Sequence, residues 1–212
     1  MKFCIIGLGR FGLQLAKSLT RNGVDVLAID RDEERVDLIK DKVTQAVVMN
    51  MIDKESLKAI GIEEMDTVVI AMGKNFAHSI LLTHILKRNI GIDRVIVRSV
   101  SATQREILEL VGADQVILPE QEAAIKLADN MSSPFMDVTH ISPGFIIAAI
   151  AAPKEFVDKT IAELQFYAIY TINCIAIKQD QETLVPTPET TIQEHDILYF
   201  AGEKKQIEKL IK

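Results

Sequence analysis

Three glycines near the N-terminus are spaced as G-x-G-x-x-G. Gly7, Gly9 and Gly12 follow the apolar run 4–6 and precede amphipathic residues that continue as a helix. In this spacing the first glycine permits a tight turn, the second lets the backbone approach a pyrophosphate, and the third allows close packing of a helix. Phosphates then lie at the partly positive N-terminus of that helix. The motif therefore predicts a nucleotide site.

Two charged residues give this prediction more detail. Asp30 ends the next apolar run, 18 residues after Gly12, where an acid accepts hydrogen bonds from ribose hydroxyls and repels a 2′-phosphate, which disfavours NADP. A competing interpretation makes Asp30 the cap of a helix that starts at Asp32. Arg10 lies inside the glycine loop, where a guanidinium favours a polyphosphate such as ATP or ADP over a hydride carrier. Its alternative is a solvated arginine on the first helical turn.

The elements that must position these residues are strands and helices in alternation. Strand-like runs occur at 2–6, 24–29, 46–49, 67–71, 94–98 and 115–118, with helical spacing between them. Such alternation predicts right-handed crossovers, a parallel sheet and helices on both faces, that is, an α/β fold of the Rossmann-like, doubly wound kind. Apolar stripes are expected on the first helix (Leu13, Leu15, Ala16 and Leu19) and on the fourth (Ile80, Leu81, His84, Ile85 and Leu86).

The second half of the chain changes character. A helical pattern begins at Pro119 and ends at "SSP", residues 132–134. Strand-like runs follow at 145–152, 172–178, 183–186 and 197–202, with short helices around 160–164 and 203–211 and a hairpin turn at 179–182. We therefore expect a Rossmann-like domain at 1–118, a crossover helix and linker at 119–136, and a small α+β domain at 137–212.

Composition limits the classes of function. With 212 residues, of which 48% are hydrophobic and 25% charged, the chain can bury two cores. The longest apolar stretch, 145–152, is far shorter than the roughly 20 residues of a membrane span, and no signal peptide is evident, so we expect a cytoplasmic protein. The net charge of −6 disfavours nucleic-acid binding. Cys4 and Cys174 both lie in apolar runs, which favours core positions over a disulfide or a metal site.

Catalytic residues are not evident. An NAD-dependent oxidoreductase needs an acid or base beside the nicotinamide, yet no histidine pairs with a candidate partner in a recognisable spacing (His78, His84, His140 and His195). A Ser/His/Asp arrangement, a His-x-x-x-His pair and a Walker lysine loop are also missing from the sequence. We expect a protein that is not an enzyme, with the oxidoreductase as the weaker alternative.

The sequence resembles RCK (also called KTN) proteins, the cytosolic regulatory subunits of Trk and Ktr potassium transporters, along nearly its whole length. The resemblance rests on "IIGLGRFG" at 5–12, "AID" at 28–30, "VVIAMG" at 68–73, "GADQVILPE" at 112–120, and on "INCIAIK", "PTPETTI" and "EHDILYFAG" in the downstream module. It implies a TrkA-like or KtrA-like homodimer that assembles into a ring, typically an octamer. The ring lies at the inner face of the membrane beneath a separate potassium-conducting subunit. ATP, ADP or NAD(H) in the Rossmann cleft changes its shape.

The resemblance also implies roles for single positions. Phosphates are held by the glycine loop, ribose by the acid after the second strand, and the rest of the nucleotide by the loops after the second to fifth strands. A divalent cation joins bound ATP near the glutamate of "LPE" at the dimer interface. The positions implied are Gly7, Gly9, Arg10, Phe11, Gly12, Asp30, Arg31, Asn50, Met51, Ala71, Met72, Gly73, Arg98 and Glu120.

Two departures from the family pattern affect ligand choice. Asn50 stands where the family often has an acid near adenine, which leaves the preferred nucleotide open. Some relatives bind cyclic di-AMP in the C-terminal module, and Ile172, Asn173 and Pro188 match that pattern loosely. Uncharged residues, however, occupy 165–167, where basic residues are common, so we expect weak or no binding. Regulation of another transporter is the remaining alternative to regulation of a potassium system.

Overall fold

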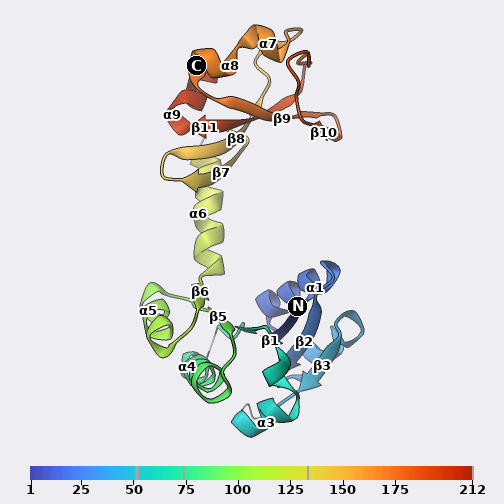
Figure 1. Cartoon of the computed structure of the whole chain (residues 1–212), viewed down its shortest axis with the longest axis vertical. Coiled ribbons are helices and arrows are strands. Elements are labelled where there is room, and N and C mark those ends of the chain that lie inside the picture. The colour runs from blue at the N-terminus through green and yellow to red at the C-terminus, as the bar shows by residue number, and fades with distance from the viewer. Residues whose placement is uncertain (51–52, 74, 133, 212) are drawn as a thin grey trace. The chain divides into compact units, whose positions relative to one another are not determined.

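The computed structural model describes residues 1–50, 53–73, 75–132 and 134–211, which form two compact units, Met1–Gln121 and Glu122–Lys212 (Figure 1). The first unit contains a parallel sheet in the order β3-β2-β1-β4-β5-β6. Its strands are β1 (Lys2–Ile6), β2 (Asp25–Asp30), β3 (Gln45–Val48), β4 (Thr67–Ile70), β5 (Arg94–Arg98) and β6 (Gln115–Ile117). This is the doubly wound order of a Rossmann-like fold, and it confirms the predicted fold class.

Helices cover both faces of this sheet, because side chains alternate along each buried strand. On β1, Ile5 packs in the same core as α1 (Arg10–Arg21) and α2 (Glu33–Asp37). Its neighbours Cys4 and Ile6 pack on the opposite face with α3 (Lys54–Ala59), α4 (Phe76–His84) and α5 (Ala102–Val111). A π-helical turn, Ile85–Ile90, continues α4, and 3₁₀ turns lie at Lys40–Lys42 and Ile62–Glu64.

The face that α4 buries differs from the predicted stripe. Leu81 and His84 are exposed, so the predicted stripe does not lie wholly in the core and a core position for His84 was wrong. Instead, Ser79, Leu82 and Thr83 are buried. Apolar residues occur nearly all round this helix, and periodicity alone then cannot choose between two adjacent stripes.

The second unit is an antiparallel sheet with short helices. Its strand order is β10-β9-β11-β8-β7, formed by β7 (Asp137–Ser142), β8 (Phe145–Ala151), β9 (Asn173–Gln179), β10 (Glu182–Leu184) and β11 (Ile197–Glu203). The helices are α7 (Ile161–Leu164), α8 (Phe166–Tyr170) and α9 (Lys204–Ile207), followed by a 3₁₀ turn at Glu208–Leu210, with a further one at Lys154–Phe156. A helix of 14 residues, α6 (Pro119–Ser132), begins in the first unit and supplies the first residues of the second. No helix in the described ranges is both long and apolar enough to span a membrane.

Aromatic rings fill the core of the second unit. Phe166 lies edge-to-face between Phe156 and Phe200, with ring centroids 5.4 Å and 4.7 Å apart, an arrangement that aromatic quadrupoles favour. The strand runs at 145–152 and 197–202 pair directly as β8 and β11. The sequence pattern does not predict α8 or β7. The first is a single short helix, and the second is a largely polar edge strand in which only Val138 is buried.

Candidate functional site

The glycine loop joins β1 to α1 and has two positions that exclude a side chain. Gly7 has φ +100°, and a Cβ there would lie 2.8 Å from Cγ of Met72. A Cβ on Gly12 would overlap the carbonyl oxygen of Gly7. A Cβ on Gly9, in contrast, would meet no described atom within 4 Å. The turn and the helix packing therefore need glycine for internal reasons, whereas Gly9 leaves the backbone open to an approaching group.

The N-terminus of α1 faces this opening without a side-chain cap. Gly9 is the N-cap residue, and no side chain in the described part of the protein accepts a hydrogen bond at this cap. The first N–H groups of a helix have no intrahelical acceptor, and they carry the positive end of the helix dipole. Arg10, the first helical residue, is exposed, and Phe11 is half-buried against the α1 side of the sheet. The loop thus offers backbone donors and one guanidinium to an anion.

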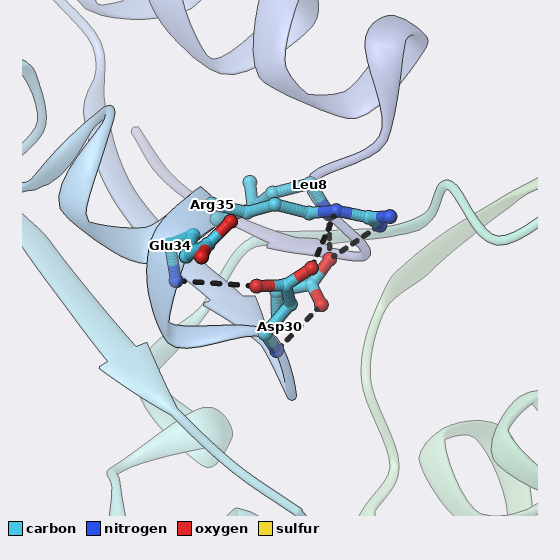
Figure 2. Close-up of polar contacts among 5 residues, drawn as sticks. Leu8, Asp30, Glu34 and Arg35 are labelled. Atoms are coloured by element: carbon cyan, nitrogen blue, oxygen red, sulfur yellow. Dashed lines mark hydrogen bonds and ion pairs between the residues drawn. The ribbon is translucent and has the colours of Figure 1, made fainter.

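Asp30, the last residue of β2, fixes the other side of the loop. Its side chain is only 6% exposed. One carboxylate oxygen accepts the N–H of Leu8 at 2.6 Å, and the other accepts the N–H of Asp32 at 3.0 Å (Figure 2). Because a carboxylate has about four acceptor positions, it retains capacity for a ribose hydroxyl. The cap of α2 is Asp32, which accepts the N–H of Glu34 at 3.1 Å, so the alternative reading of Asp30 as that cap was wrong.

Arg35 is a site residue that the sequence analysis missed. It extends from α2 across both acids, with Nη1 3.6 Å from Oδ2 of Asp30 and Nε 3.1 Å from Oδ2 of Asp32 (Figure 2). The spacing of Asp32 and Arg35, three residues apart at a helix start, is the sequence signal for this pair. The neighbouring Arg31 is exposed. The guanidinium of Arg35 partly neutralises the acidic group that is expected to meet ribose.

Residues after β4 and β5 line the same carboxyl edge of the sheet, where open α/β sheets bind ligands. Ala71 is buried, and Met72 packs against the glycine loop. A Cβ on Gly73 would overlap the guanidinium of Arg98, the last residue of β5. Arg98 pairs through Nη2 with Oε1 of Glu120. Its buried Nε has no hydrogen-bond partner among the described residues.

Glu120, in the first turn of α6, lies in a positive environment. Its own backbone N–H, a hydrogen bond from Arg98 and the charge of Arg10 hold the pKa of this carboxyl below its usual value, although burial opposes them slightly. Arg10, Arg98 and Glu120 therefore influence one another at this edge. Asn50, two residues after the end of β3, is exposed. Met51 lies outside the described residues.

The described residues contain no group of three or more His, Cys, Asp or Glu side chains that could hold a metal ion. A cation at Glu120 would therefore need most of its ligands from elsewhere. The three positions matched to cyclic di-AMP also differ in surroundings. Ile172 is fully buried, with Cγ2 2.6 Å from a Cβ built on Gly202, so its side chain is not at the surface. Asn173 and Pro188 are exposed.

Two family models match the chain. The TrkA-N domain matches residues 3–119, and the TrkA-C domain matches residues 145–212. The Ktr system potassium uptake protein C of Bacillus subtilis (strain 168) is 33% identical over 213 residues, covering 100% of this chain and 96% of that protein. The Ktr system potassium uptake protein A of the same organism is 34% identical over 210 residues, covering 98% and 94%.

Among solved structures, the GsuK channel bound to NAD superposes with a TM-score of 0.57 at 24% identity. The match covers 99% of this chain and 38% of the GsuK chain. At this identity the likeness shows a shared fold across both units.

Proposed function

The chain belongs to the family of proteins with TrkA-N and TrkA-C domains and is similar to Ktr system potassium uptake proteins, and on this premise we propose that it is a nucleotide-sensing regulatory subunit of a potassium uptake system. In this proposal it is a cytoplasmic protein without catalytic activity. Homodimers assemble into an octameric ring under a separate integral-membrane, potassium-conducting subunit. Identities of 33% and 34% along almost the whole of both Ktr relatives support it.

One observation carries the nucleotide part of the proposal. The glycine loop opens at Gly9, and the buried carboxylate of Asp30 is hydrogen-bonded to the same loop through the N–H of Leu8. An adenine nucleotide with a free ribose diol suits this pair, with phosphates at the N-terminus of α1 and hydroxyls at Asp30. ATP, ADP and NAD(H) all have such a diol, whereas the 2′-phosphate of NADP would meet the acid.

The guanidinium groups give the site a means of distinguishing nucleotides. Arg10 and Arg98 lie at the phosphate end, and a triphosphate brings more negative charge to them than a diphosphate does. A charge-assisted hydrogen bond contributes about 1.5–3 kcal/mol, and less at an exposed position such as Arg10. A ligand shifts a conformational equilibrium only through its differential affinity for the two states. We infer that this difference drives the ring rather than any chemical step.

The test is isothermal titration calorimetry of the full chain with ATP, ADP, NADH and NADPH. The Arg10→Ala variant is expected to lose affinity for ATP more than for ADP. Arg21→Ala, at the opposite end of the same helix and also exposed, is the matched control and should bind both as the wild type does. The proposal would be contradicted if Arg10→Ala and Arg21→Ala lost the same affinity for ATP, or if no nucleotide bound the wild-type chain at millimolar concentration.

The regulated partner is tested separately. Cells that lack potassium uptake are given a Ktr-type membrane subunit with or without this chain, and uptake of potassium is measured. We expect faster uptake with the chain and a smaller stimulation with its Asp30→Asn variant. Nucleotide binding without any stimulation would favour regulation of another transporter.

A further inference from the structure

The arginine expected to meet a phosphate is already paired with an acid of its own chain. Arg98 lies at the carboxyl end of β5 with its side chain 16% exposed, and it pairs with Glu120, whose side chain is 69% exposed. The pair joins the end of the sheet to the first turn of α6. An anion that binds Arg98 must therefore compete with this carboxylate.

Arg98 is held in place but not fully satisfied. The missing side chain of Gly73 leaves the space in which its guanidinium lies. The pair with Glu120 uses Nη2, while the buried Nε has no hydrogen-bond partner in the described ranges. A buried donor without a partner costs free energy that a suitable acceptor recovers. Of the guanidinium nitrogens, Nη2 is thus paired with Glu120 and Nε is unpaired among the described residues, on a group that can bind a phosphate bidentately.

Glu120, in contrast, can be displaced from Arg98 at low cost. Its carboxylate is mostly in solvent, so exchanging Arg98 for water costs it little. A phosphate group can accept from two nitrogens of one guanidinium together, whereas the observed pair with Glu120 uses Nη2 alone. The nearby charge of Arg10 attracts either anion to this place. A phosphate is therefore expected to bind Arg98 in preference to the carboxylate of Glu120.

We propose that Glu120 is an intramolecular competitor for the nucleotide phosphate, which it excludes from Arg98 until the phosphate displaces it. The inference rests on the proposed nucleotide site and goes beyond it, because it gives Glu120 an inhibitory role in binding. Since Glu120 belongs to the first turn of α6, the exchange releases the ion pair that ties the start of this helix to β5. Nucleotide binding thereby reaches a helix that continues into the second unit.

The experiment compares ADP binding to the wild-type chain and to Glu120→Gln by calorimetry in EDTA, which removes divalent cations. Glu120→Gln should bind ADP about two- to fivefold more tightly, the range expected from loss of a largely exposed ion pair. Binding of adenosine, which has no phosphate, should not change. Glu64→Gln is the matched control, because it breaks the Lys2–Glu64 ion pair at a carboxylate of similar exposure, 68%, and it should bind ADP as the wild type does.

Equal or weaker ADP binding by Glu120→Gln overturns the inference, as does an equal gain for adenosine or for Glu64→Gln. Glu120→Ala must reproduce the gain, which excludes a new contact made by the glutamine amide. If the wild-type chain binds ADP and neither variant binds it more tightly, this inference alone fails. If the wild-type chain binds no adenine nucleotide, the proposed function fails with it.

Discussion

Replacing Asp30 with asparagine tests whether this carboxylate builds the glycine loop as well as the ribose site. The carboxylate accepts two backbone N–H groups, from Leu8 at 2.6 Å and from Asp32 at 3.0 Å. An asparagine has one acceptor oxygen, so its amide N–H₂ must face one of these donors. A buried donor left without an acceptor costs about 1–3 kcal/mol. Nη1 of the half-exposed Arg35 lies 3.6 Å from Oδ2 of Asp30, and loss of this ion pair adds only a fraction of this cost. We expect the free energy of unfolding to fall by about 2 kcal/mol.

Urea unfolding followed by far-ultraviolet circular dichroism measures this loss, since the chain has no tryptophan. Asp32→Asn is the matched control on the same turn. Asp32 caps α2 and pairs with Arg35, and its side chain is more exposed than that of Asp30. Asparagine caps a helix about as well as aspartate, so this variant weakens only the exposed ion pair, at a cost of about 1 kcal/mol or less. Calorimetry with ADP and 2′-deoxy-ADP then isolates the ribose contact. The wild type should prefer ADP, and Asp30→Asn should lose most of that preference.

Two results would refute the reasoning. If Asp30→Asn is no less stable than Asp32→Asn, the carboxylate does not anchor the loop. If Asp30→Asn keeps the full preference for ADP over 2′-deoxy-ADP, the carboxylate does not contact the 2′-hydroxyl.

Three further predictions concern backbone space and charge. Gly12→Ala places a Cβ on a backbone oxygen, so the free energy of unfolding should fall by about 1–3 kcal/mol. The Cβ of Gly9→Ala meets no described atom. This variant should therefore be as stable as the wild type in urea unfolding and should lose affinity for ADP in calorimetry. Gly73→Ala displaces only the flexible end of Arg98; ADP affinity should fall about as much as in Arg98→Ala, with little further loss in the double variant, and full additivity would contradict this. Burial raises the pKa of Asp114, but hydrogen bonds from a backbone N–H and a lysine ammonium outweigh it and hold the pKa below its usual value. The stability this gives is present above the unfolded pKa near 4 and is lost as pH falls through the folded pKa. In Asp114→Asn the free energy of unfolding should therefore fall less steeply as the pH is lowered below about 4. The same dependence on pH as in the wild type would contradict this prediction.

Sequence predicted the first sheet closely because its central strands β1, β2 and β4 are buried on both faces. In the sequence such strands are short apolar runs that end at polar residues or glycine. The predicted strands 2–6 and 94–98 coincide with β1 and β5. The edge strand β7 does not have this signature, because it is mostly polar and has one buried side chain. The short helix α8 lies between two residues with positive φ, Gln165 before it and Thr171 after it. Residue propensities do not predict this backbone conformation at a residue other than glycine.

The predicted site residues follow a similar division. Gly7, Gly12 and Asp30 were predicted from the spacing of the glycines and of the acid that ends the second strand, a pattern that places them at the carboxyl edge of the sheet. Arg35 and the Arg98–Glu120 pair depend on side-chain positions, and the latter joins residues 22 apart. A pattern of residue types places such groups at an edge of the sheet without saying which of them touch.

Asp30 and Glu120, the two acids of the proposed nucleotide site, differ in the property that decides whether a ligand can displace them. Asp30 is buried and holds two backbone N–H groups, which cannot turn to water when a ligand arrives, so its contacts persist and a ribose hydroxyl must use the remaining acceptor positions. Glu120 is mostly exposed and holds the flexible end of Arg98, so both partners can exchange at low cost. One acid is therefore a fixed part of the site and the other a replaceable one, and only the second can transmit the arrival of a phosphate to α6.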